Sequence, residues 1–473
     1  MFDRTMILMA CALLCSVAHA DAGADTRQLA RDVYKQLIEI NTEDSIGSVT
    51  AASEAMAQRF RDAGFPEGDI HVLGATDRTK NLVVRLHGTG KRKPVLLIGH
   101  LDVVEARPED WTTDPFKLVV KDGYYYGRGT QDMKSGDAVM VATLIRLKKE
   151  GFRPDRDIIL ALTAGEESGL SNGVGWLTTH ARPLVDAEFV LNSDGYGVIM
   201  EHGKPSIVRI DATEKVYADF QLTVTNPGGH SSLPVPDNAI YRLAAGLDRL
   251  ASYEFPFELN DVTRTYYTRR ASMETGQRAA DIRAILATPP DPVAIVRLSA
   301  DRLDHAMTHT TCVATRLEGG HANNALPQMA RAVVNCRILP GHSAEETRKT
   351  LITVFADPKI AVRYIGEDGQ ILDTAESKHG FAPPALRPDV LQALEKVAAQ
   401  FWPGVPVIPA MSTGASDAVY ASAAGLPTFA VNGLAMDRDD VRAHGKDERI
   451  RVESFDRAVD FYYPFLKALL AYP

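Results

Sequence analysis

Potential metal ligands and acid–base groups of this chain stand where predicted strands end or in the loops between them. The apolar runs 93–100, 157–165 and 188–194 each end in, or are followed directly by, His, Asp or Glu. Two more such residues lie in the segments YYYGRGTQDMKSG (124–136) and RAHGKDERI (442–450). Rigid strands place the residues at their ends around a common cleft. The candidate set is His100, Asp102, Asp132, Glu166, Glu167, Asp194 and His444.

Histidine and carboxylate side chains together are typical ligands of Zn²⁺ or a similar divalent ion. A bridging carboxylate lets two such ions sit about 3.5–4 Å apart, and an acid left over beside them can act as general base. Strand alternation puts His100 and Asp102 on one face, where the carboxylate can orient the imidazole. Two plainer interpretations stay open, namely Asp132 as the N-cap of the next helix and Glu166-Glu167 as a solvated loop pair.

Short buried strands alternate with helices from about residue 26 to residue 211. The three apolar runs are typical of strands that helices cover on both faces. Residues 132–151 have helical periodicity, with Lys148 and Lys149 in the last turn before Gly151. This order predicts an α/β domain with a largely parallel sheet. The same texture returns after about residue 371, so we expect this domain to be discontinuous.

The segment between residues 212 and 370 has a different texture, with the period-two alternation of half-exposed strands. A strand, a helix, two strands, a helix that opens with Ser343 and Glu346, and a last strand follow one another. The order β-α-β-β-α-β predicts a ferredoxin-like module inserted into the first domain. Residues 254–308, rich in charge and Pro, interrupt this order and predict a mostly helical excursion.

The composition is that of a soluble globular enzyme. The chain has 473 residues, of which 45% are hydrophobic and 24% charged. Lys and Arg number 52 against 61 Asp and Glu, which gives a net charge of −9. Because no basic run or stripe is present, we expect no nucleic-acid partner.

The N-terminus has the pattern of a secretory signal peptide. Residues 5–17 are almost wholly apolar, follow Arg4 and precede Ala18-His19-Ala20, which predicts cleavage after Ala20. We therefore expect a secreted or periplasmic protein without membrane contact after cleavage. Cys312 and Cys336 remain on neighbouring predicted strands, where they can pair in an oxidising compartment or both simply be buried.

Six short motifs occur in one order over nearly the whole chain that follows the signal. In this order they resemble the dinuclear zinc peptidases, the family of glutamate carboxypeptidase, aminoacylase, carboxypeptidase S and succinyl-diaminopimelate desuccinylase. The segment 254–308 is most similar to an enlarged lid region of the carboxypeptidase S branch. The motifs are GHLDVV (99–104), YGRGTQDMKSG (126–136), GEES (165–168), SDG (193–195), GGHSS (228–232) and GASDA (414–418).

Together with the resemblance, these patterns predict a signal peptide over 1–20, a catalytic domain over 21–211 and 371–473, and an inserted lid and dimerisation domain over 212–370. The resemblance also implies a homodimer with two Zn²⁺ per chain, for which Co²⁺ or Mn²⁺ could substitute. By the same resemblance, His100 and Asp194 would bind one ion, Glu167 and His444 the other, and Asp132 would bridge both. Glu166 would be the general base, Asp102 would support His100, and the Asp132-Met133 peptide bond would be cis.

Further roles follow from the resemblance for residues of the second domain. His230 would stabilise the oxyanion in a partner subunit's cleft. Asn324 and Arg337 would bind the substrate carboxylate, a task that suits a bidentate guanidinium. Gly414, Ala415 and Ser416 would line the pocket floor.

The function predicted from these residues is hydrolysis of an amide bond next to a carboxylate-bearing amino acid by a metal-activated water. The substrate would be a small peptide or an N-acyl amino acid, so that carboxypeptidase, dipeptidase and aminoacylase activities stay open. Two remote alternatives are a non-catalytic binding protein on the same scaffold and a dinuclear phosphoesterase. The first predicts the loss of ligands that are present, and the second lacks a phosphate-cradling Gly loop.

Overall fold

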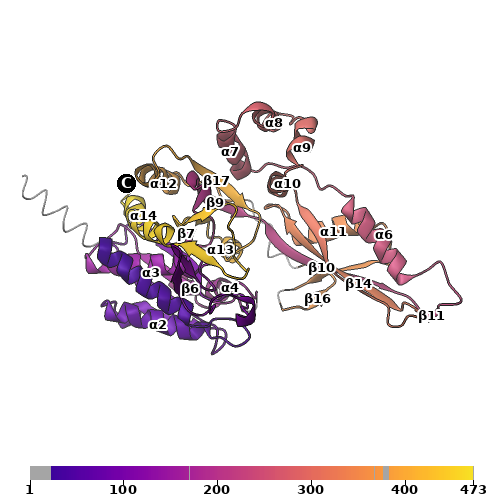
Figure 1. Cartoon of the computed structure of the whole chain (residues 1–473), viewed down its shortest axis with the longest axis horizontal. Helices are drawn as coiled ribbons and strands as arrows, with labels where there is room; N and C mark the ends of the chain where they lie inside the picture. Colours follow the sequence, from indigo (N-terminus) through magenta and orange to yellow (C-terminus); the bar gives the residue numbers. More distant parts are fainter. Residues whose placement is uncertain (1–22, 170, 367, 376–382, 472–473) are drawn as a thin grey trace, which may run out of the picture. The chain divides into compact units, whose positions relative to one another are not determined.

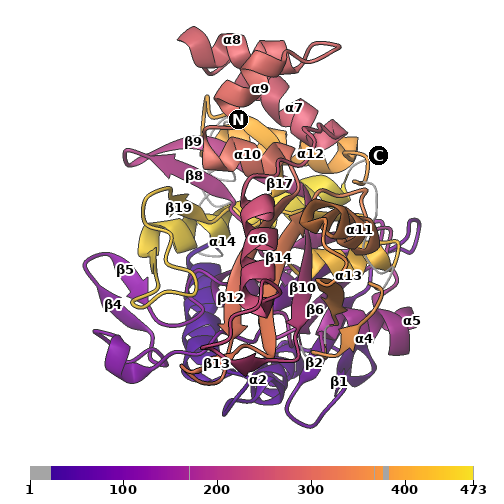
Figure 2. The same ribbon diagram turned by 90° about the vertical axis from the view of Figure 1, so that its right-hand side faces the viewer.

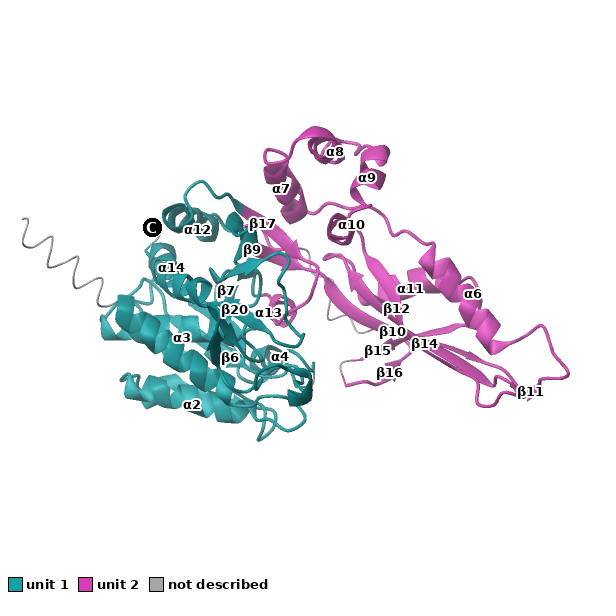
Figure 3. Ribbon diagram, viewed as in Figure 1, with its two compact units in different colours: residues 1–210, 387–407, 426–473 teal, residues 211–386, 408–425 magenta. Residues whose placement is uncertain are grey.

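The computed structural model describes residues 23–169, 171–366, 368–375 and 383–471. The expected signal peptide lies outside these residues. The chain divides into two compact units (Figure 3). Unit 1 comprises residues 1–210, 387–407 and 426–473, and unit 2 comprises residues 211–386 and 408–425.

Unit 1 is built on a mixed ten-stranded sheet in the order β1-β2-β6-β3-β7-β18-β9-β8-β19, with β17 paired to β9. At its centre β3 pairs in parallel with β6 and β7, and β7 pairs in parallel with β18. Towards the edges, β1, β2 and β6 pair antiparallel, as do β8 and β9. The strands are β1 (Ile70–Gly74), β2 (Lys80–Leu86), β3 (Val95–His100), β6 (Ile158–Thr163), β7 (Phe189–Asn192), β8 (Val198–Glu201), β9 (Lys204–Glu214), β17 (Val407–Ser412), β18 (Thr428–Ala430) and β19 (Ala435–Asp437).

The three apolar runs of the sequence form the centre of this sheet. Every residue of β3, β6 and β7 is buried. Helix α3 (Lys134–Lys149) packs on β3, α14 (Val452–Leu470) packs on α3, and α12 (Pro388–Phe401) packs on α14 (Figure 1). Helix α2 (Val49–Asp62) packs on β1 and β2. Burial of both faces therefore explains why these strands read as continuous apolar runs rather than as alternating ones.

Two glycines allow α3 to approach the strands that carry functional residues. A Cβ on Gly99 of β3 would lie 2.2 Å from Oδ1 of Asp137, and a Cβ on Gly136 would lie 2.1 Å from Oγ of Ser193. Any larger side chain at either position would therefore push the start of α3 away from the sheet. Because Asp132 lies just before α3, this close packing helps to set its height above the strand ends.

The remaining elements of unit 1 are short or peripheral. A helix covers residues 23–39, and a small antiparallel sheet has the order β20-β5-β4. These further elements are η1 (Glu67–Asp69), η2 (Pro108–Asp110), β4 (Val119–Lys121), β5 (Tyr124–Tyr126), α4 (Gly173–His180), α5 (Arg182–Val185) and β20 (Arg449–Arg451).

Unit 2 contains a five-stranded antiparallel sheet in the order β12-β14-β10-β15-β16, with a two-stranded β11-β13 ribbon. Along the chain its main elements follow the β-α-β-β-α-β order of a ferredoxin-like module. They are β10 (Val216–Thr225), α6 (Ala239–Ala251), β12 (Thr311–Gly319), β14 (Met329–Ile338), α11 (Ala344–Phe355) and β15 (Ala361–Ile365). Shorter elements of the unit are β11 (Gly229–His230), β13 (Ala325–Leu326), β16 (Ile371–Leu372) and α13 (Ala418–Ala423).

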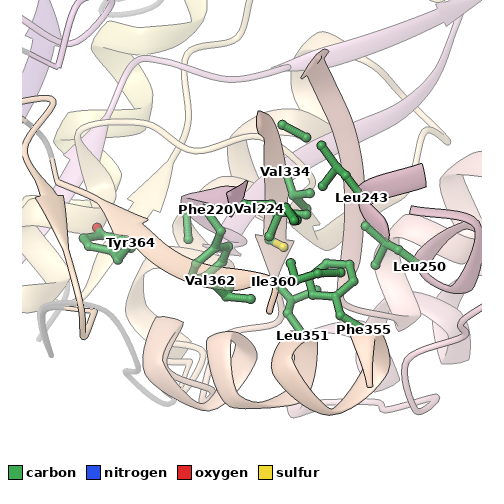
Figure 4. Packing of buried hydrophobic residues seen from close by; sticks show 14 of the residues in the cluster. Phe220, Val224, Leu243, Leu250, Val334, Leu351, Phe355, Ile360, Val362 and Tyr364 are labelled. Carbon is green, nitrogen blue, oxygen red and sulfur yellow. The ribbon is translucent and has the colours of Figure 1, made fainter. Parts of the chain in front are cut away.

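The core of unit 2 lies between this sheet and the helices α6 and α11 (Figures 2 and 4). Buried and half-exposed residues alternate along β14, which is the pattern expected for a sheet covered on one face. Phe220 and Val334 from the strands meet Leu243 from α6 and Phe355 from α11 in one cluster. Helix α11 begins at a capping box in which Ser343 and Glu346 bond reciprocally, as the sequence predicted.

Residues 254–308 form a set of short helices with a core of their own. These are α7 (Asp261–Arg270), α8 (Gly276–Ile285), α9 (Pro292–Leu298) and α10 (Arg302–Thr308). Tyr267, Ile282, Ile285 and Leu298 are among the buried residues of this core. The segment is therefore a helical excursion, as its sequence texture predicted, and it returns to the sheet at β12.

Cys312 and Cys336 form a disulfide between directly opposed positions of β12 and β14. The alternative that both are simply buried as thiols is therefore wrong. Among the residues that the structure describes, none of the helices combines the length and the apolar character needed to cross a membrane.

Candidate metal centre

The parallel centre of the unit 1 sheet brings three groups of predicted ligands to one edge. His100 is the last residue of β3, Glu166 and Glu167 follow β6, and Asp194 follows β7. Strands β6, β3 and β7 are neighbours and run in the same direction. Their carboxyl ends therefore open on the same side, which is where ligands bind in open α/β sheets.

Asp132 lies between the two histidines of the predicted set. Nε2 of His100 is 3.1 Å from Oδ1 of Asp132, and Nε2 of His444 is 3.2 Å from Oδ2 of the same carboxylate. The N-cap of α3 is Met133, so the alternative role of Asp132 as helix cap is wrong. One carboxylate that offers an oxygen to each of two histidines has the arrangement required of a bridging ligand.

Two groups of three potential ligands share Asp132. One consists of His100, Asp132 and Asp194, and the other of Asp132, Glu167 and His444. In each group the potential ligand atoms lie within 4.8 Å of one another. A third such group joins His100 to Glu166 and Glu167. Imidazole nitrogen and carboxylate oxygen suit Zn²⁺, and the first two groups fit a pair of divalent ions with one shared ligand.

The electrostatics of the set favour positive charge. Although burial lowers it, the pKa of His100 is held well above its ordinary value by Asp132, Glu166 and Asp102. Hydrogen bonds with Asp132 and Glu167 raise the pKa of His444 to about 10. Although burial raises it, the pKa of Asp132 is lowered below its ordinary value by the two histidines. Asp132 thus remains ionised, and a divalent cation would take the place of the protons that the histidines hold.

The neighbouring acids Glu166 and Glu167 differ in their contacts. Oε2 of Glu167 lies 3.0 Å from Nε2 of His444. Oε2 of Glu166 lies 4.0 Å from Nε2 of His100, at the other end of Asp132. Both side chains are largely buried, at 15% exposure for Glu166 and 8% for Glu167. The interpretation of this pair as a solvated loop is therefore wrong.

Asp102 supports the site in a different way from the one expected. Nδ1 of His100 lies 3.0 Å from the carbonyl oxygen of Asp102, while the nearer carboxylate oxygen is 3.9 Å away. The carboxylate instead accepts hydrogen bonds from the backbone N–H groups of Glu166 and Glu167, at 3.3 and 2.9 Å. Asp102 therefore orients the imidazole through its backbone and fixes the loop after β6 through its side chain.

The peptide bond between Asp132 and Met133 is cis, as the resemblance implied. His444 has a positive φ of 63° and its side chain is 55% exposed, in contrast to the 1% of His100. The two histidines thus come from different settings, one from a buried strand and one from an exposed loop.

Arg337 and the segment 414–416 lie near the same end of β10 within unit 2. Arg337 stands opposite Tyr217, with its guanidinium 4.6 Å from the ring centroid. Oγ of Ser416 donates to Glu214 at 2.8 Å, and the N–H of Lys215 donates to the carbonyl oxygen of Ser412 at 3.1 Å. Gly414 and Ala415 lie between these two anchors. No carboxylate of the described residues forms an ion pair with the half-buried Arg337.

Lys215 adds a second basic group to this end of unit 2. Its side chain is fully buried, and Nζ donates to the carbonyl oxygen of His309 at 2.7 Å and to Oγ1 of Thr311 at 3.2 Å. Burial, with a smaller contribution from the charge on Arg337, lowers the pKa of Lys215 to about 7.

His230 and Asn324 lie together, but apart from Arg337. His230 pairs with Ala325 in the β11-β13 ribbon, and the carbonyl oxygen of Asn324 accepts from the N–H of Ser231 at 3.0 Å. Both residues are exposed. The ribbon follows the far end of β10, a strand of ten residues that spans about 30 Å at ~3.3 Å per residue. Unit 2 therefore does not bring Asn324 and Arg337 together.

Sequence reasoning missed two residues that hold the ligand loops. Glu448, in the same RAHGKDERI string as His444, is fully buried and accepts hydrogen bonds from the backbone before α3. Nδ2 of Asn432 donates to the carbonyl oxygens of Ser193 and Gly195, on either side of Asp194, at 2.8 and 2.7 Å. An acid four residues after His444 was a visible signal, whereas Asn432 stands in no motif.

Comparison with known proteins agrees with the fold. Residues 96–468 match the model of peptidase family M20/M25/M40. The match covers well over half of the chain, which therefore belongs to this family of metal-dependent peptidases and amidohydrolases.

Three known proteins illustrate the similarity. A probable carboxypeptidase S-like protein of Dictyostelium discoideum is 27% identical over 389 residues, which cover 79% of this chain and 71% of that protein. The N-fatty-acyl-amino acid synthase/hydrolase PM20D1 of Xenopus tropicalis is 27% identical over 385 residues, with 79% and 72% covered. The M20 family metallo-carboxypeptidase Sso-CP2 of Sulfolobus solfataricus has the same fold, with a TM-score of 0.70, 17% identity, and 94% and 99% of the two chains covered.

Proposed function

We propose that the protein is a dinuclear zinc hydrolase that cleaves the amide bond next to a carboxylate-bearing amino acid, as a carboxypeptidase does. The observation that carries this proposal is the pair of ligand groups that share Asp132. His100 and Asp194 would hold one ion, and Glu167 and His444 the other. Both groups lie in unit 1 and depend on three adjacent strand ends and two loops.

The chemistry divides between the ions and the side chains around them. Bound divalent ions lower the pKa of a shared water and polarise a carbonyl group. Glu167 contacts His444, whereas the Glu166 carboxylate lies on the other side of the set, 4.0 Å from Nε2 of His100. In our proposal Glu166 would accept the proton of the attacking water and return it to the leaving amine. No protein nucleophile is required.

Arg337 is our candidate for recognition of the substrate carboxylate. A half-buried guanidinium without a carboxylate partner among the described residues is costly unless an anion pairs with it. A planar, bidentate donor suits a terminal carboxylate. We expect Arg337→Met to raise KM for substrates with a free carboxylate while the metal content stays unchanged.

A panel of dipeptides and N-acyl amino acids, each paired with its carboxyl-amidated counterpart, tests this proposal. The expected result is hydrolysis of the free acids, with kcat/KM falling at least about tenfold on amidation, since a lost charged hydrogen bond costs roughly 1.5–3 kcal/mol. Arg337→Met should abolish most of this discrimination. Equal hydrolysis of free and amidated substrates by the wild-type protein would contradict the carboxylate requirement.

A second candidate, hydrolysis of N-acyl amino acids, is favoured by one of the relatives. The PM20D1 protein of Xenopus tropicalis is named an N-fatty-acyl-amino acid synthase/hydrolase. The two candidates share the site and differ in the group on the amine side of the scissile bond. The same panel separates them, because an aminoacylase prefers acyl chains where a carboxypeptidase or dipeptidase prefers an amino acid residue.

We further propose that two copies of the chain form the complete site. Nδ1 of His230 accepts from the N–H of Ser232 at 3.2 Å, so neutral His230 carries its proton on Nε2 and can donate to an oxyanion. Yet His230 follows the far end of the ~30 Å strand β10 from Arg337. One small substrate cannot contact both residues of the same unit 2, so we assign His230, with Asn324, to a partner subunit's site.

Mixing inactive variants tests the shared site. His230→Ala and Glu166→Gln should each be nearly inactive alone. After subunit exchange a mixed dimer holds one site with Glu166 of one chain and His230 of the other, so activity should return in part. Absence of rescue in a mixture shown to contain mixed dimers would contradict the proposal.

We propose that the protein is exported. Support comes from the signal-like residues 1–20 and from the Cys312–Cys336 disulfide, a feature of oxidising compartments. Expression of the full chain in a Gram-negative host should give a periplasmic product that starts at Asp21. A cytoplasmic product with residues 1–20 retained would contradict export.

A further inference from the structure

We propose that Glu448 is a positioning residue that, together with Gln131, holds Asp132 and His444 in register for one of the two metal sites. The inference rests on the proposed dinuclear centre. It concerns above all the site formed by Asp132, Glu167 and His444, where Glu448 and Gln131 hold two of the three ligands; the site of His100 and Asp194 is held only through the shared Asp132.

Both oxygens of the Glu448 carboxylate accept hydrogen bonds from the segment that leads to Asp132. Oε1 accepts from the N–H groups of Gln131 and Asp132, at 2.6 and 3.1 Å. Oε2 accepts from the N–H of Gly129 at 3.0 Å and from Nη1 of Arg128 at 2.7 Å. Glu448 is fully buried, and the Arg128 side chain is 3% exposed. A buried carboxylate with this number of donors fixes their backbone in one conformation.

Gln131 joins the segment that leads to Asp132 to the loop that carries His444 through a second set of hydrogen bonds. Its Nε2 donates to the carbonyl oxygens of Asp440 and Arg449, at 3.1 and 2.8 Å, and its Oε1 accepts from the N–H of Arg442 at 2.7 Å. The side chain immediately before Asp132 therefore spans the loop that carries His444. Glu448 and Gln131 form a reciprocal clamp between the two loops.

The two metal sites need this clamp to different degrees. His100 ends a fully buried strand, and the backbone around Asp194 is held by Asn432. His444, in contrast, lies in an exposed loop, and α3, which begins just after Asp132, has no side-chain cap at its N-terminus. Ligand positions must hold to about 0.5 Å for tight metal binding. Loss of the clamp should therefore weaken the site of Glu167 and His444 more than the site of His100 and Asp194.

Cobalt titration of the metal-free protein, followed by calorimetry and by the Co²⁺ absorption spectrum, tests the inference. The wild type should bind two Co²⁺ per chain. Glu448→Gln replaces one acceptor oxygen with an NH₂ group that faces backbone donors. The variant should bind one Co²⁺ with at most a small loss of affinity and the other about 10–100-fold more weakly, as for other supporting partners of metal ligands.

A control and a second variant keep the test decisive. Glu188→Gln alters another unit 1 carboxylate, one that pairs with Arg156 and Arg387, and should leave both Co²⁺ affinities unchanged. If Glu448→Gln does not fold, Gln131→Ala serves instead. It removes only the hydrogen bonds of the Gln131 side chain and should show the same selective weakening. Two Co²⁺ bound with wild-type affinity by a folded variant would overturn the inference, even if its thermal stability had fallen. Failure of the wild type to bind two Co²⁺ would instead overturn the proposed dinuclear function.

Discussion

Glu166 and Glu167 are adjacent in the chain but contact different ends of the ligand set. Glu167 contacts His444, and Glu166 lies on the His100 side. We predict that Glu166→Gln keeps its metal but loses about 10²–10⁴-fold in kcat, since it loses the proton acceptor. Glu167→Gln should lose metal as well as activity. Metal analysis and steady-state kinetics check both variants, and equal metal loss in the two would mean that their roles are exchanged.

Lys215 should make the stability of the protein depend on pH. Its folded pKa is about 7 against an ordinary 10.5, so between these values the unfolded chain binds a proton that the folded chain does not. The free energy of unfolding therefore rises with pH from about 7 towards 10, by at most about 5 kcal/mol at ~1.4 kcal/mol per pKa unit. Below pH 7 the buried ammonium is charged and this contribution is absent.

Urea unfolding of the wild type and of Lys215→Met at pH 6.5, 8 and 9.5 measures this contribution. The stability of the wild type relative to the variant should increase with pH. Arg337 and His309 face Lys215 and are common to both proteins. A stability difference that does not vary over this range would show that Lys215 is not buried in its neutral form.

At the residue scale, the sequence indicated the candidate metal ligands better than the residues that support them. His100, Glu167 and Asp194 stand at the ends of buried runs, which makes their meeting predictable. Glu448 and Asn432 act through backbone groups of segments distant in the chain, and no local spacing reveals such a contact. The role of the Asp102 carboxylate was likewise misjudged, because alternation predicts a face and not a hydrogen-bond partner.

At the scale of elements, the disulfide fastens the edge strand β12 to β14. It closes a loop with a sequence separation of 24 residues, for which cross-linking stabilises by about 2–4 kcal/mol. We predict that the double variant Cys312→Ala, Cys336→Ala loses about that much stability towards urea. Reductant should destabilise the wild type to a similar extent and leave the variant unaffected. Equal stability of the variant and the oxidised wild type would contradict this prediction.

Hydrophobic periodicity predicted those strands whose burial is regular along their whole length. Strands β3, β6 and β7 are buried on both faces, and β10 and β14 on one, so their patterns are distinct. The antiparallel edges of the unit 1 sheet were not expected. Strands β1 and β8 are short and mostly half-exposed, and β2 lies outside the clear alternation of strands and helices. Pairing direction is set by the connections between strands, which a local pattern does not encode.

At the scale of the whole molecule, segments distant in the sequence form each compact unit. Residues 426–473 belong to unit 1 and supply His444 and Glu448, whereas residues 408–425 group with unit 2. A return of α/β texture after residue 371 indicated the first of these facts. The grouping of residues 408–425 with unit 2 depends on contacts of β17 and Ser412 near the junction of β9 and β10, which only the folded chain shows.

The central claim is that hydrolysis depends on two metal ions held around Asp132. The most direct test is elemental analysis of the purified protein combined with amide hydrolysis before and after complete chelation. We predict about two divalent ions per chain, loss of hydrolysis in the metal-free protein, and recovery when Zn²⁺, Co²⁺ or Mn²⁺ is restored. Hydrolysis that persists in protein without measurable metal would contradict the account.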